Sequence, residues 1–315
     1  MRAGASTRAA VGRLHSVNLR QLEYFVAIAE EGSFTRAAER LLVAQPSLSQ
    51  QIAALEAEVG GPLLERLPRG IRLTSAGESF LADARAAIGH ADGARRAARM
   101  ALGLQAGQLE IAAATSAGTG FLPWVLQRWQ QRHPEVEVSL HEFAHRRALD
   151  EAVRDGDSDM AIGSRPVAWQ GPVEHLGWEE FVLVLPNGDP QLGNRSVAIA
   201  DLADRRWVHY AATHGLAEVV DMRCAAAGFT PRVSLRTSQV GAVARFAAAG
   251  LGPALVPDHV LGDDLRPLAR HARPRIIREV VAFSRTDWLP ITRAFLDVLH
   301  EYPWARKPAR AVDLG

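Results

Sequence analysis

Residues 33–59, SFTRAAERLLVAQPSLSQQIAALEAEV, decide the fold of the N-terminal part of the chain, because they predict two helices joined by a short turn. Ser33 is a favourable N-cap for the first helix. Ala37, Ala38 and Leu41 then lie on one face of it. Two amphipathic helices joined so closely predict a helix-turn-helix, although tandem helices of this kind also occur in proteins that do not bind DNA.

The second helix follows a turn at Val43–Gln45 and begins at Pro46, where a helix tolerates proline because the missing N–H had no partner. Its apolar residues are spaced by four, three and four positions and form one stripe: Leu48, Ile52, Leu55 and Val59. Its opposite face carries short polar side chains that can reach base edges and phosphates: Ser47, Ser49, Gln50 and Gln51. We therefore expect this helix to contact DNA.

A basic hairpin follows. Gly60–Pro62 ends the helix, and residues 63–73, LLERLPRGIRL, predict two short strands around a turn at Pro68–Gly70. The segment carries three arginines, Arg66, Arg69 and Arg72, against the single carboxylate of Glu65. A basic hairpin directly after a recognition helix is typical of a wing that contacts phosphates or the minor groove. An ordinary solvated hairpin is the alternative.

Two further helices flank these elements. Asn18 is an N-cap candidate for a largely buried helix that ends at Glu31. Residues 75–103 predict a long helix, in which Ser75 and Glu78 are spaced as a capping box. Its heptad seam consists of small and apolar residues: Phe80, Ala84, Ala87, Ala91, Ala94, Ala98 and Ala101. A rod of about 40 Å would not be stable alone, so we expect it to pair with a second copy, although alanine is also simply the best helix former.

The length, charge and cysteine count of the chain limit which classes of protein it can belong to. A length of 315 residues predicts two or more domains. The net charge of +1 and a pI near 8.1 do not point to nucleic acid, so any basic surface must be local. The single cysteine, Cys224, excludes an internal disulfide framework and suits a reducing compartment. With no bilayer-spanning run and no secretory signal, we expect a cytoplasmic protein without a membrane partner.

From residue 105 onward, strands alternate with helices, which predicts a layered α/β domain with a largely parallel sheet. The expected strands are Gln108–Ala114, Val136–Leu140, Asp159–Gly163, Phe181–Leu185, Leu255–Pro257 and Val280–Phe283. The expected helices are Phe121–Arg132, one around Leu149 and Val153, Gly215–Ala227, Val240–Ala249 and Ile291–His300.

The run from Leu19 to Glu78 resembles the winged helix-turn-helix of LysR-type transcriptional regulators almost position by position. The landmarks are Ala37-Ala38, Leu41, Gln45-Pro46, Leu48-Ser49, Leu55-Glu56, Gly60, Leu63, Glu65-Arg66, Leu73-Thr74 and Ala76-Gly77. The rest, to about residue 302, resembles the family's effector domain, which has the two-lobed fold of periplasmic solute-binding proteins. Its weaker markers include Phe121-Leu122-Pro123, Asp159-Met160-Ala161-Ile162 and Gly250-Leu251-Gly252.

The resemblance implies a DNA-binding surface. It places Gln45, Pro46, Ser47, Ser49 and Gln50 at the major groove, Ser33, Thr35 and Arg36 near the backbone, and Arg69 on the wing, where we add Arg66 and Arg72. The position of Gln50 usually holds Arg or Lys in the family, and Ala53-Ala54 often holds further basic residues. We therefore expect fewer charged phosphate contacts and a shallower salt dependence than is usual for the family.

The expected fold is α+β and multidomain. It comprises a disordered extension (1–17), a winged helix-turn-helix (18–74), a linker and dimerisation helix (75–104), a two-lobed α/β effector domain of periplasmic-binding-protein type (105–302) and a tail (303–315). The first lobe would span about 107–165 and 267–302, and the second about 166–266. Because family members start close to Asn18, we expect translation to start at Val17 and residues 1–16 to be a gene-model artefact.

A small-molecule effector, carboxylated in many relatives, is expected between the lobes. Thr115, Ser116 and Gly118 form a strand-to-helix loop whose N–H groups suit an anion. The candidates on the facing lobe are Thr213, His214 and Ser238, and Arg165 at the crossover could counter a carboxylate. For each polar residue, a satisfied loop cap is the alternative. Phe143 stands where the family usually has glycine, which would narrow the pocket.

His141-Glu142-Phe143-Ala144-His145 matches H-E-x-x-H, so a zinc-dependent hydrolase is the alternative function. That chemistry needs both histidines on one helix face, whereas the alternation from Val136 to Leu140 places the motif at the end of a strand. We therefore predict no enzyme and no cofactor. The prediction is a sequence-specific transcriptional regulator, a dimer or tetramer, with double-stranded DNA, the effector and RNA polymerase as partners. Effector closure of the cleft would change how the linker helices space the recognition helices.

Overall fold

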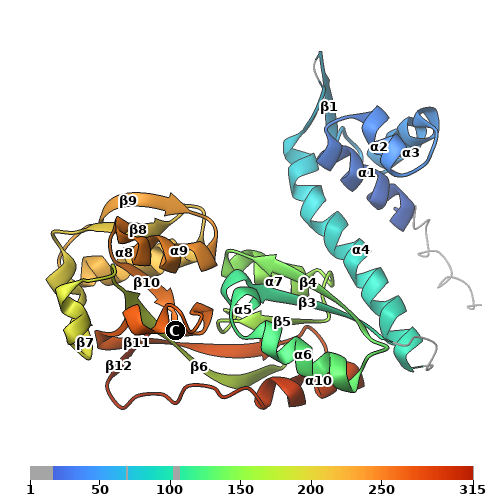
Figure 1. The fold of residues 1–315 in the computed structure, drawn as a ribbon. Coiled ribbons are helices and arrows are strands. Elements are labelled where there is room, and N and C mark those ends of the chain that lie inside the picture. Colours follow the sequence, from blue (N-terminus) through green and yellow to red (C-terminus); the bar gives the residue numbers. More distant parts are fainter. Residues whose placement is uncertain (1–16, 69, 102–106, 315) are drawn as a thin grey trace, which may run out of the picture. The chain divides into compact units, whose positions relative to one another are not determined.

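The computed structural model describes residues 17–68, 70–101 and 107–314 (Figure 1). The chain falls into two compact units, Met1–Ala94 and Arg95–Gly315, and each is described here by itself. The predicted extension lies outside the described residues apart from Val17, and Arg69 also lies outside them. No helix in the described ranges has both the length and the apolar character needed to cross a membrane.

The first unit contains the predicted helices and hairpin. Its elements are α1 (Leu19–Glu31), α2 (Phe34–Arg40), α3 (Gln45–Val59), β1 (Leu64–Leu67), β2 (Gly70–Leu73) and the first part of α4 (Ser75–Ala101). Asn18 caps α1, where its side chain and that of Gln21 form a reciprocal capping box. The apolar stripe of α3 is buried at Leu48, Ile52 and Leu55, whereas Val59 is 42% exposed at the end of the helix. The amphipathic pattern therefore predicted the packing of α3 except for its last turn.

The turn of the helix-turn-helix begins earlier than expected. The first helix ends at Arg40 and α3 begins at Gln45, so Leu41–Ala44 form the connection and Pro46 is the second helical residue. Leu42 lies in this turn with a φ of 54°, and its side chain is 93% exposed. A left-handed backbone is strained for a residue with a Cβ atom, so Leu42 lowers the stability of a turn that its sequence neighbours otherwise favour.

The N-cap of α4 lies one residue before the predicted position, Ser75. Thr74, and not Ser75, caps this helix: the Gly77 N–H donates to Thr74 Oγ1 at 3.0 Å and the Glu78 N–H to the Thr74 carbonyl at 2.8 Å. The first residues of the heptad seam also pack inside their own unit. The Phe80 ring meets that of Phe25 edge to face at 5.3 Å, and Ala84 is buried in the same core. This part of the seam therefore stabilises the fold of the first unit itself.

The second unit is a mixed α/β structure. Its strands are β3 (Gln108–Ala114), β4 (Glu137–Phe143), β5 (Met160–Gly163), β6 (Val173–Val184), β7 (Ser196–Ala198), β8 (Arg206–Tyr210), β9 (Arg232–Thr237), β10 (Ala254–Pro257), β11 (Ala269–Phe283) and β12 (Ala311–Asp313). Its α-helices are α5 (Thr115–Thr119), α6 (Leu122–Arg132), α7 (Arg146–Arg154), α8 (Gly215–Ala226), α9 (Val240–Phe246) and α10 (Pro290–His300). Short helical turns include η4 (Asp258–Val260).

The expectation of a largely parallel sheet is wrong for the centre of this unit. The main sheet has the order β10-β6-β11-β5-β3-β4, with β7 and β12 also paired to β11. Pairs β3–β4 and β3–β5 are parallel, whereas β6–β10, β6–β11 and β5–β11 are antiparallel. Strands β8 and β9 form a separate parallel pair that the sequence pattern did not reveal. Figure 1 shows β6 and β11 as two long strands that run from one lobe into the other.

Strand alternation builds the first lobe around this sheet. Leu109, Ile111 and Ala113 of β3 pack with α6 and α10, whereas Ala112 points to the other face and packs with α7. In α6, Leu122, Val125 and Trp129 recur at helical spacing and are buried against the sheet. Helices therefore cover both faces of this part of the sheet.

The chain passes from one lobe to the other at later positions in the sequence than we expected. On β6, Leu176 belongs to the core of the first lobe and Phe181 to that of the second; on β11, Ile276 belongs to the second and Val280 to the first. The crossing thus lies near residues 177–180 and 277–279 instead of near Arg165 and Pro267, because long strands carry the chain beyond the loops that the sequence pattern marked.

The segment labelled as a tail, residues 303–315, is part of the fold as far as it is described. Trp304 packs its ring against Phe121 at 4.7 Å in the first lobe. The chain then pairs β12 in parallel with Arg275–Ile277 of β11, and the Leu314 N–H donates to the Ile277 carbonyl at 2.9 Å. Leu314 packs against the core of the second lobe. The C-terminal segment therefore bridges the two lobes.

Candidate functional site

The N-terminal end of α3 presents polar groups at the surface of the first unit. Gln45, Pro46, Ser47 and Gln50 are exposed, and Ser49 is half-buried. Gln45 Nε2 donates to Ser49 Oγ at 3.0 Å, one helical turn away. The buried stripe holds this helix from behind, so its outer face offers donors and acceptors that can meet base edges in a major groove.

Two of the three residues expected near the DNA backbone also make contacts within the protein. Ser33 Oγ accepts the Arg36 N–H at 3.4 Å, so this side chain caps α2. Thr35 is exposed. The exposed Arg36 guanidinium also contacts the carbonyl of Glu31 and lies 3.6 Å from its carboxylate. Thr35 and Arg36 remain accessible to phosphates, whereas Ser33 is mainly structural.

The hairpin is less basic than its composition suggests. Glu65 and Arg72 face each other across β1 and β2, with Arg72 Nη2 at 2.6 Å from Glu65 Oε2. The exposed Arg66 guanidinium lies over the Phe34 ring at 4.9 Å. Arg69 lies outside the described residues. Of the two arginines in the described part of the hairpin, Arg72 is paired with a carboxylate and Arg66 is not.

A pocket of about 400 Å³ lies between the two lobes of the second unit. The first lobe contributes the starts of α5 and α7, and the second contributes the start of α8. Its lining residues are Ala114, Thr115, Ser116, Phe143, Ala144, His145, Arg146, Arg147, Leu149, Ser164, His214, Gly215, Leu216, Glu218, Val219, Met222, Arg278 and Leu314. Three of the predicted effector contacts, Thr115, Ser116 and His214, are therefore brought together from opposite lobes.

His214 is held rigidly at the start of α8. Its Nδ1 accepts the Leu216 N–H at 3.1 Å, and its ring stacks on Tyr210 at 5.3 Å. Burial lowers the pKa of His214, and the nearby His145 and Arg278 lower it further. Because Nδ1 accepts the Leu216 N–H, it carries no hydrogen, so the hydrogen of the ring lies on Nε2. Among the described residues, buried Nε2 has no hydrogen-bond partner.

Arg278 enters the pocket from β11 at the crossing between lobes. Its Nε donates to Glu179 Oε1, and His259 Nε2 lies 2.7 Å from Glu179 Oε2. Burial raises the pKa of Glu179, but Arg278 and His259 outweigh it and lower the value to about 2. The ionised carboxylate thus fixes the Arg278 guanidinium, which also lies over the Phe181 ring at 5.2 Å.

Four predicted effector contacts do not line this pocket. Arg165 was expected to counter a carboxylate, but its guanidinium makes two bonds to Glu279, at 2.8 and 3.0 Å. Glu142 packs directly over Gly118, where a Cβ atom would lie 2.0 Å from Glu142 Oε1. Thr213 contributes its carbonyl oxygen to His145 Nε2, and Ser238 is exposed after β9. Loop position alone did not reveal which side chains converge.

The H-E-x-x-H match has a structural explanation. His141 lies on β4 with Nε2 at 2.9 Å from Glu110 Oε2, whereas His145 precedes α7 and contacts the Thr213 carbonyl. The two imidazoles therefore have separate partners. No group of three or more His, Cys, Asp or Glu side chains within the described ranges could hold a metal ion.

Sequence reasoning missed Arg278, Leu314 and the start of α7 as parts of the pocket. A signal existed for Arg278, because it is a charged residue within the apolar run Ile276–Phe283. None existed for Leu314, since its contribution depends on the pairing of β12 with β11.

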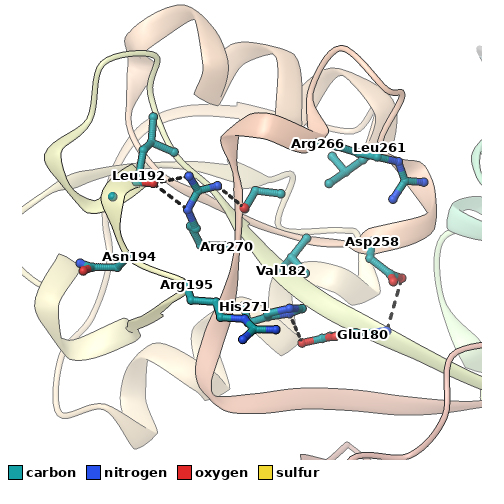
Figure 2. Close-up of a pocket in the computed structure, with 12 residues that line it drawn as sticks. Glu180, Val182, Leu192, Asn194, Arg195, Asp258, Leu261, Arg266, Arg270 and His271 are labelled. Carbon is teal, nitrogen blue, oxygen red and sulfur yellow. Dashed lines mark hydrogen bonds and ion pairs between the residues drawn. The ribbon is translucent and has the colours of Figure 1, made fainter.

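A larger cavity of about 550 Å³ lies in the second lobe (Figure 2). Its buried charge is already satisfied: Glu180 pairs with His271 at 2.8 Å and with Arg275. As Figure 2 shows, the Arg270 guanidinium donates to backbone carbonyls, including that of Leu192. We therefore consider the smaller interlobe pocket to be the candidate ligand site.

Comparisons with known proteins agree with this arrangement. The model of the LysR substrate binding domain matches residues 102–304, and that of the bacterial regulatory helix-turn-helix protein, lysR family, matches residues 19–78. The chain belongs to the LysR family. It is thus a transcriptional regulator with a DNA-binding helix-turn-helix domain and an effector-binding domain.

Relatives of this LysR-family chain share its organisation. The HTH-type transcriptional regulator AlsR of Bacillus subtilis is 36% identical over 245 residues, which cover 76% of this chain and 80% of AlsR. The Hca operon transcriptional activator HcaR of Escherichia coli is 31% identical over 294 residues, covering 90% and 98%. Full-length CbnR complexed with its target DNA is similar in structure, with a TM-score of 0.63 and 27% identity over 90% of this chain and 99% of that one. Full-length OxyR of Pseudomonas aeruginosa has a TM-score of 0.65 at 25% identity, covering 91% and 94%.

Proposed function

We propose that this LysR-family regulator reads an operator with the outer face of α3 and responds to an anionic small molecule between its lobes. The observation that carries the first part is the exposed polar surface of Gln45, Ser47 and Gln50 on a helix whose opposite face is buried. The hairpin, with Arg66 and Arg69, and the α2 residues Thr35 and Arg36 would add phosphate contacts. This assignment makes the chain a binding protein and not an enzyme.

The second part rests on the interlobe pocket. Thr115, Ser116 and His214 meet there, and Arg278 adds a fixed positive charge. A ligand that touches both lobes binds one lobe arrangement better than others and so shifts the population towards it. We infer that this shift reaches the DNA through α4 and changes how RNA polymerase uses the promoter. Such a protein would act in the cytoplasm.

We also propose that the protein is a homo-oligomer. Ala91 and Ala94 continue the small-residue seam of α4 beyond the part that packs in the first unit. Small residues allow two helices to approach closely, and an unsupported helix of this length gains little stability by itself. Sedimentation of the purified chain should give a dimer or tetramer, and a monomer at micromolar concentration would contradict this part of the proposal.

The decisive test is operator binding. Fluorescence anisotropy with the intergenic DNA upstream of the protein's own gene should give much tighter binding than scrambled DNA of equal length. Because Gln50 replaces a cation common in relatives, we expect a shallow salt dependence, and the slope of log K against log salt counts the phosphate contacts. Equal affinity for both DNAs at every salt concentration would contradict sequence-specific recognition.

A further inference from the structure

We propose that the interlobe pocket takes a monocarboxylic acid with an apolar body, and that Arg278 and His214 together hold its carboxylate. The inference rests on the proposed function, because it assigns a ligand class to the proposed effector pocket. It assigns the carboxylate to Arg278 and gives His214 a defined task as a hydrogen-bond donor.

The first argument is the unpaired donor of His214. The side chain is 4% exposed, lines the pocket, and has no partner for Nε2 among the described residues. Its ring cannot turn to find one, because Nδ1 is engaged by the Leu216 N–H and the face is stacked on Tyr210. Buried donors are almost always paired in folded proteins. A ligand oxygen would supply the missing acceptor.

The second argument is the orientation of Arg278. Its guanidinium has five N–H donors, of which Nε–H is used by Glu179. The side chain is 15% exposed and lines the pocket, so its remaining N–H groups are available at the pocket wall. Since Glu179 and Phe181 already fix the guanidinium, little conformational entropy is lost when it binds an anion.

The surroundings favour an anion over a neutral ligand. The pocket receives the N-terminal ends of α7, which has nine residues, and α8, which has twelve. The first N–H groups of α8 already have acceptors, since those of Gly215 and Leu216 donate to the Ala144 carbonyl and to His214 Nδ1. The attraction for negative charge therefore comes from the positive ends of the two helix dipoles. Arg146 at the start of α7 adds a further cation, whereas Glu218 on α8 is the carboxylate that lines the pocket. Glu218 would repel a second carboxylate, which favours a monoacid.

The other walls favour an apolar body. Phe143, Leu149, Leu216, Val219, Met222 and Leu314 line the same pocket. Ligand pockets are commonly about 300–1,000 Å³, and the 400 Å³ found here leaves room beyond a carboxylate. An inorganic anion would satisfy the charged end and leave these apolar walls without a partner.

The experiment is calorimetric titration of the full-length protein with butyrate, hexanoate, 3-phenylpropionate and cyclohexanecarboxylate, each beside its primary amide, and with sulfate. We expect at least one acid to bind, and to bind at least tenfold more tightly than its amide and than sulfate. If no acid binds, if amides bind equally well, or if sulfate matches the best acid, the proposal is overturned.

Two substitutions test the residues, and each has a matched control. Asn at position 214 keeps an acceptor for the Leu216 N–H and remains a good helix cap, but lacks the Nε2–H donor. We expect His214→Asn to lower the affinity for the best-binding acid about tenfold. His214→Gln, which restores a donor near the position of Nε2, should recover part of that affinity. Arg278→Lys should also lower the affinity for that acid about tenfold, since a single ammonium group cannot bind both Glu179 and the ligand. Arg275→Lys, also on β11 but outside the pocket lining, should change nothing.

Unchanged affinity in both His214→Asn and Arg278→Lys would overturn the assignment. Circular dichroism and operator binding of each variant, measured in parallel, establish that the fold is retained. These readouts also separate the two proposals: failure of operator binding in the unaltered protein contradicts the proposed function, whereas indifference to charge in the titrations contradicts only the ligand class.

Discussion

The candidate DNA-binding face draws its main groups from six consecutive residues, Gln45–Gln50, whereas the interlobe pocket draws on α5, α7, α8, β11 and the C-terminal segment. On α3 the side chains are mostly exposed and one helix positions them all. In the pocket, His214 is buried and is held by its sequence neighbours Tyr210 and Leu216, whereas Arg278 is 15% exposed and is held by Glu179, which is distant in sequence. Local periodicity is thus enough to find the first surface, whereas the second exists only when two lobes meet.

The same contrast holds for ion pairs. Arg72 and Glu65 form an exposed pair on the hairpin, while Arg278 and Glu179 form a buried one at the lobe crossing. Exposed pairs are weak because water and salt screen them. Removal of one partner from a buried pair leaves an uncompensated charge in a poorly hydrated site. Removal of one partner should therefore lower the stability far more at Arg278–Glu179 than at Arg72–Glu65.

The largest predicted effect follows from that difference. Glu179→Ala should destabilise the second unit by about 3–5 kcal/mol, because it leaves Arg278 and His259 without their shared carboxylate. Glu65→Ala, the matched change on the hairpin, should cost less than about 1 kcal/mol. Urea denaturation of both variants measures the two values. Equal losses would contradict the distinction between the buried and the exposed pair.

Acid should reveal the buried pair as well. The folded pKa of Glu179 is about 2, below its ordinary value of 4.5, so unfolding favours protonation of this group. Its contribution to stability is fully present above pH 4.5 and is lost as the pH falls from there towards 2. Glu179→Gln should flatten the pH dependence of stability in this window. Thermal unfolding of both proteins between pH 5 and 3 is the measurement, and identical slopes would exclude this group as the cause.

A smaller effect is expected on α3. Gln50→Ala should weaken operator binding by about 1–2 kcal/mol, roughly tenfold, if the exposed amide reads a base edge. Ser47→Ala should act in the same direction. Gln191→Ala, a polar surface change in the second unit, serves as the control. Anisotropy with operator and scrambled DNA measures the change, and an equal loss on both DNAs would assign Gln50 to phosphate contact instead.

The smallest effect should be a gain in stability at Leu42. This residue adopts a φ of 54° with its side chain in solvent. Asparagine tolerates the left-handed region better, so Leu42→Asn should stabilise the first unit by about 0.5–1 kcal/mol. Thermal unfolding of the variant provides the test, with Leu67→Asn, an exposed apolar residue on β1, as the control. A loss of stability would indicate that Leu42 makes a favourable contact in the folded protein.

Individual elements show where sequence reasoning worked and failed. It located α1, α2, α3 and the hairpin within about two residues, because caps and apolar stripes act over a few positions. It placed the cap of α4 at Ser75 because the spacing to Glu78 suited it, yet the Thr74 hydroxyl lies closer to the first free N–H groups. It did not predict β8 and β9. It also predicted β6 and β11 as shorter strands than they are, because their polar residues at the lobe crossing interrupt the apolar pattern.

The sequence by itself determined the helix-turn-helix and much of the succession of strands and helices. These features depend on short-range spacing, capping and alternation, which are visible in one dimension. The tertiary structure alone decided that Arg278 enters the pocket while Arg165 turns to Glu279, and that Leu314 returns to close a wall. Those outcomes depend on strand pairing and on competition between charges far apart in the chain, which residue spacing does not encode.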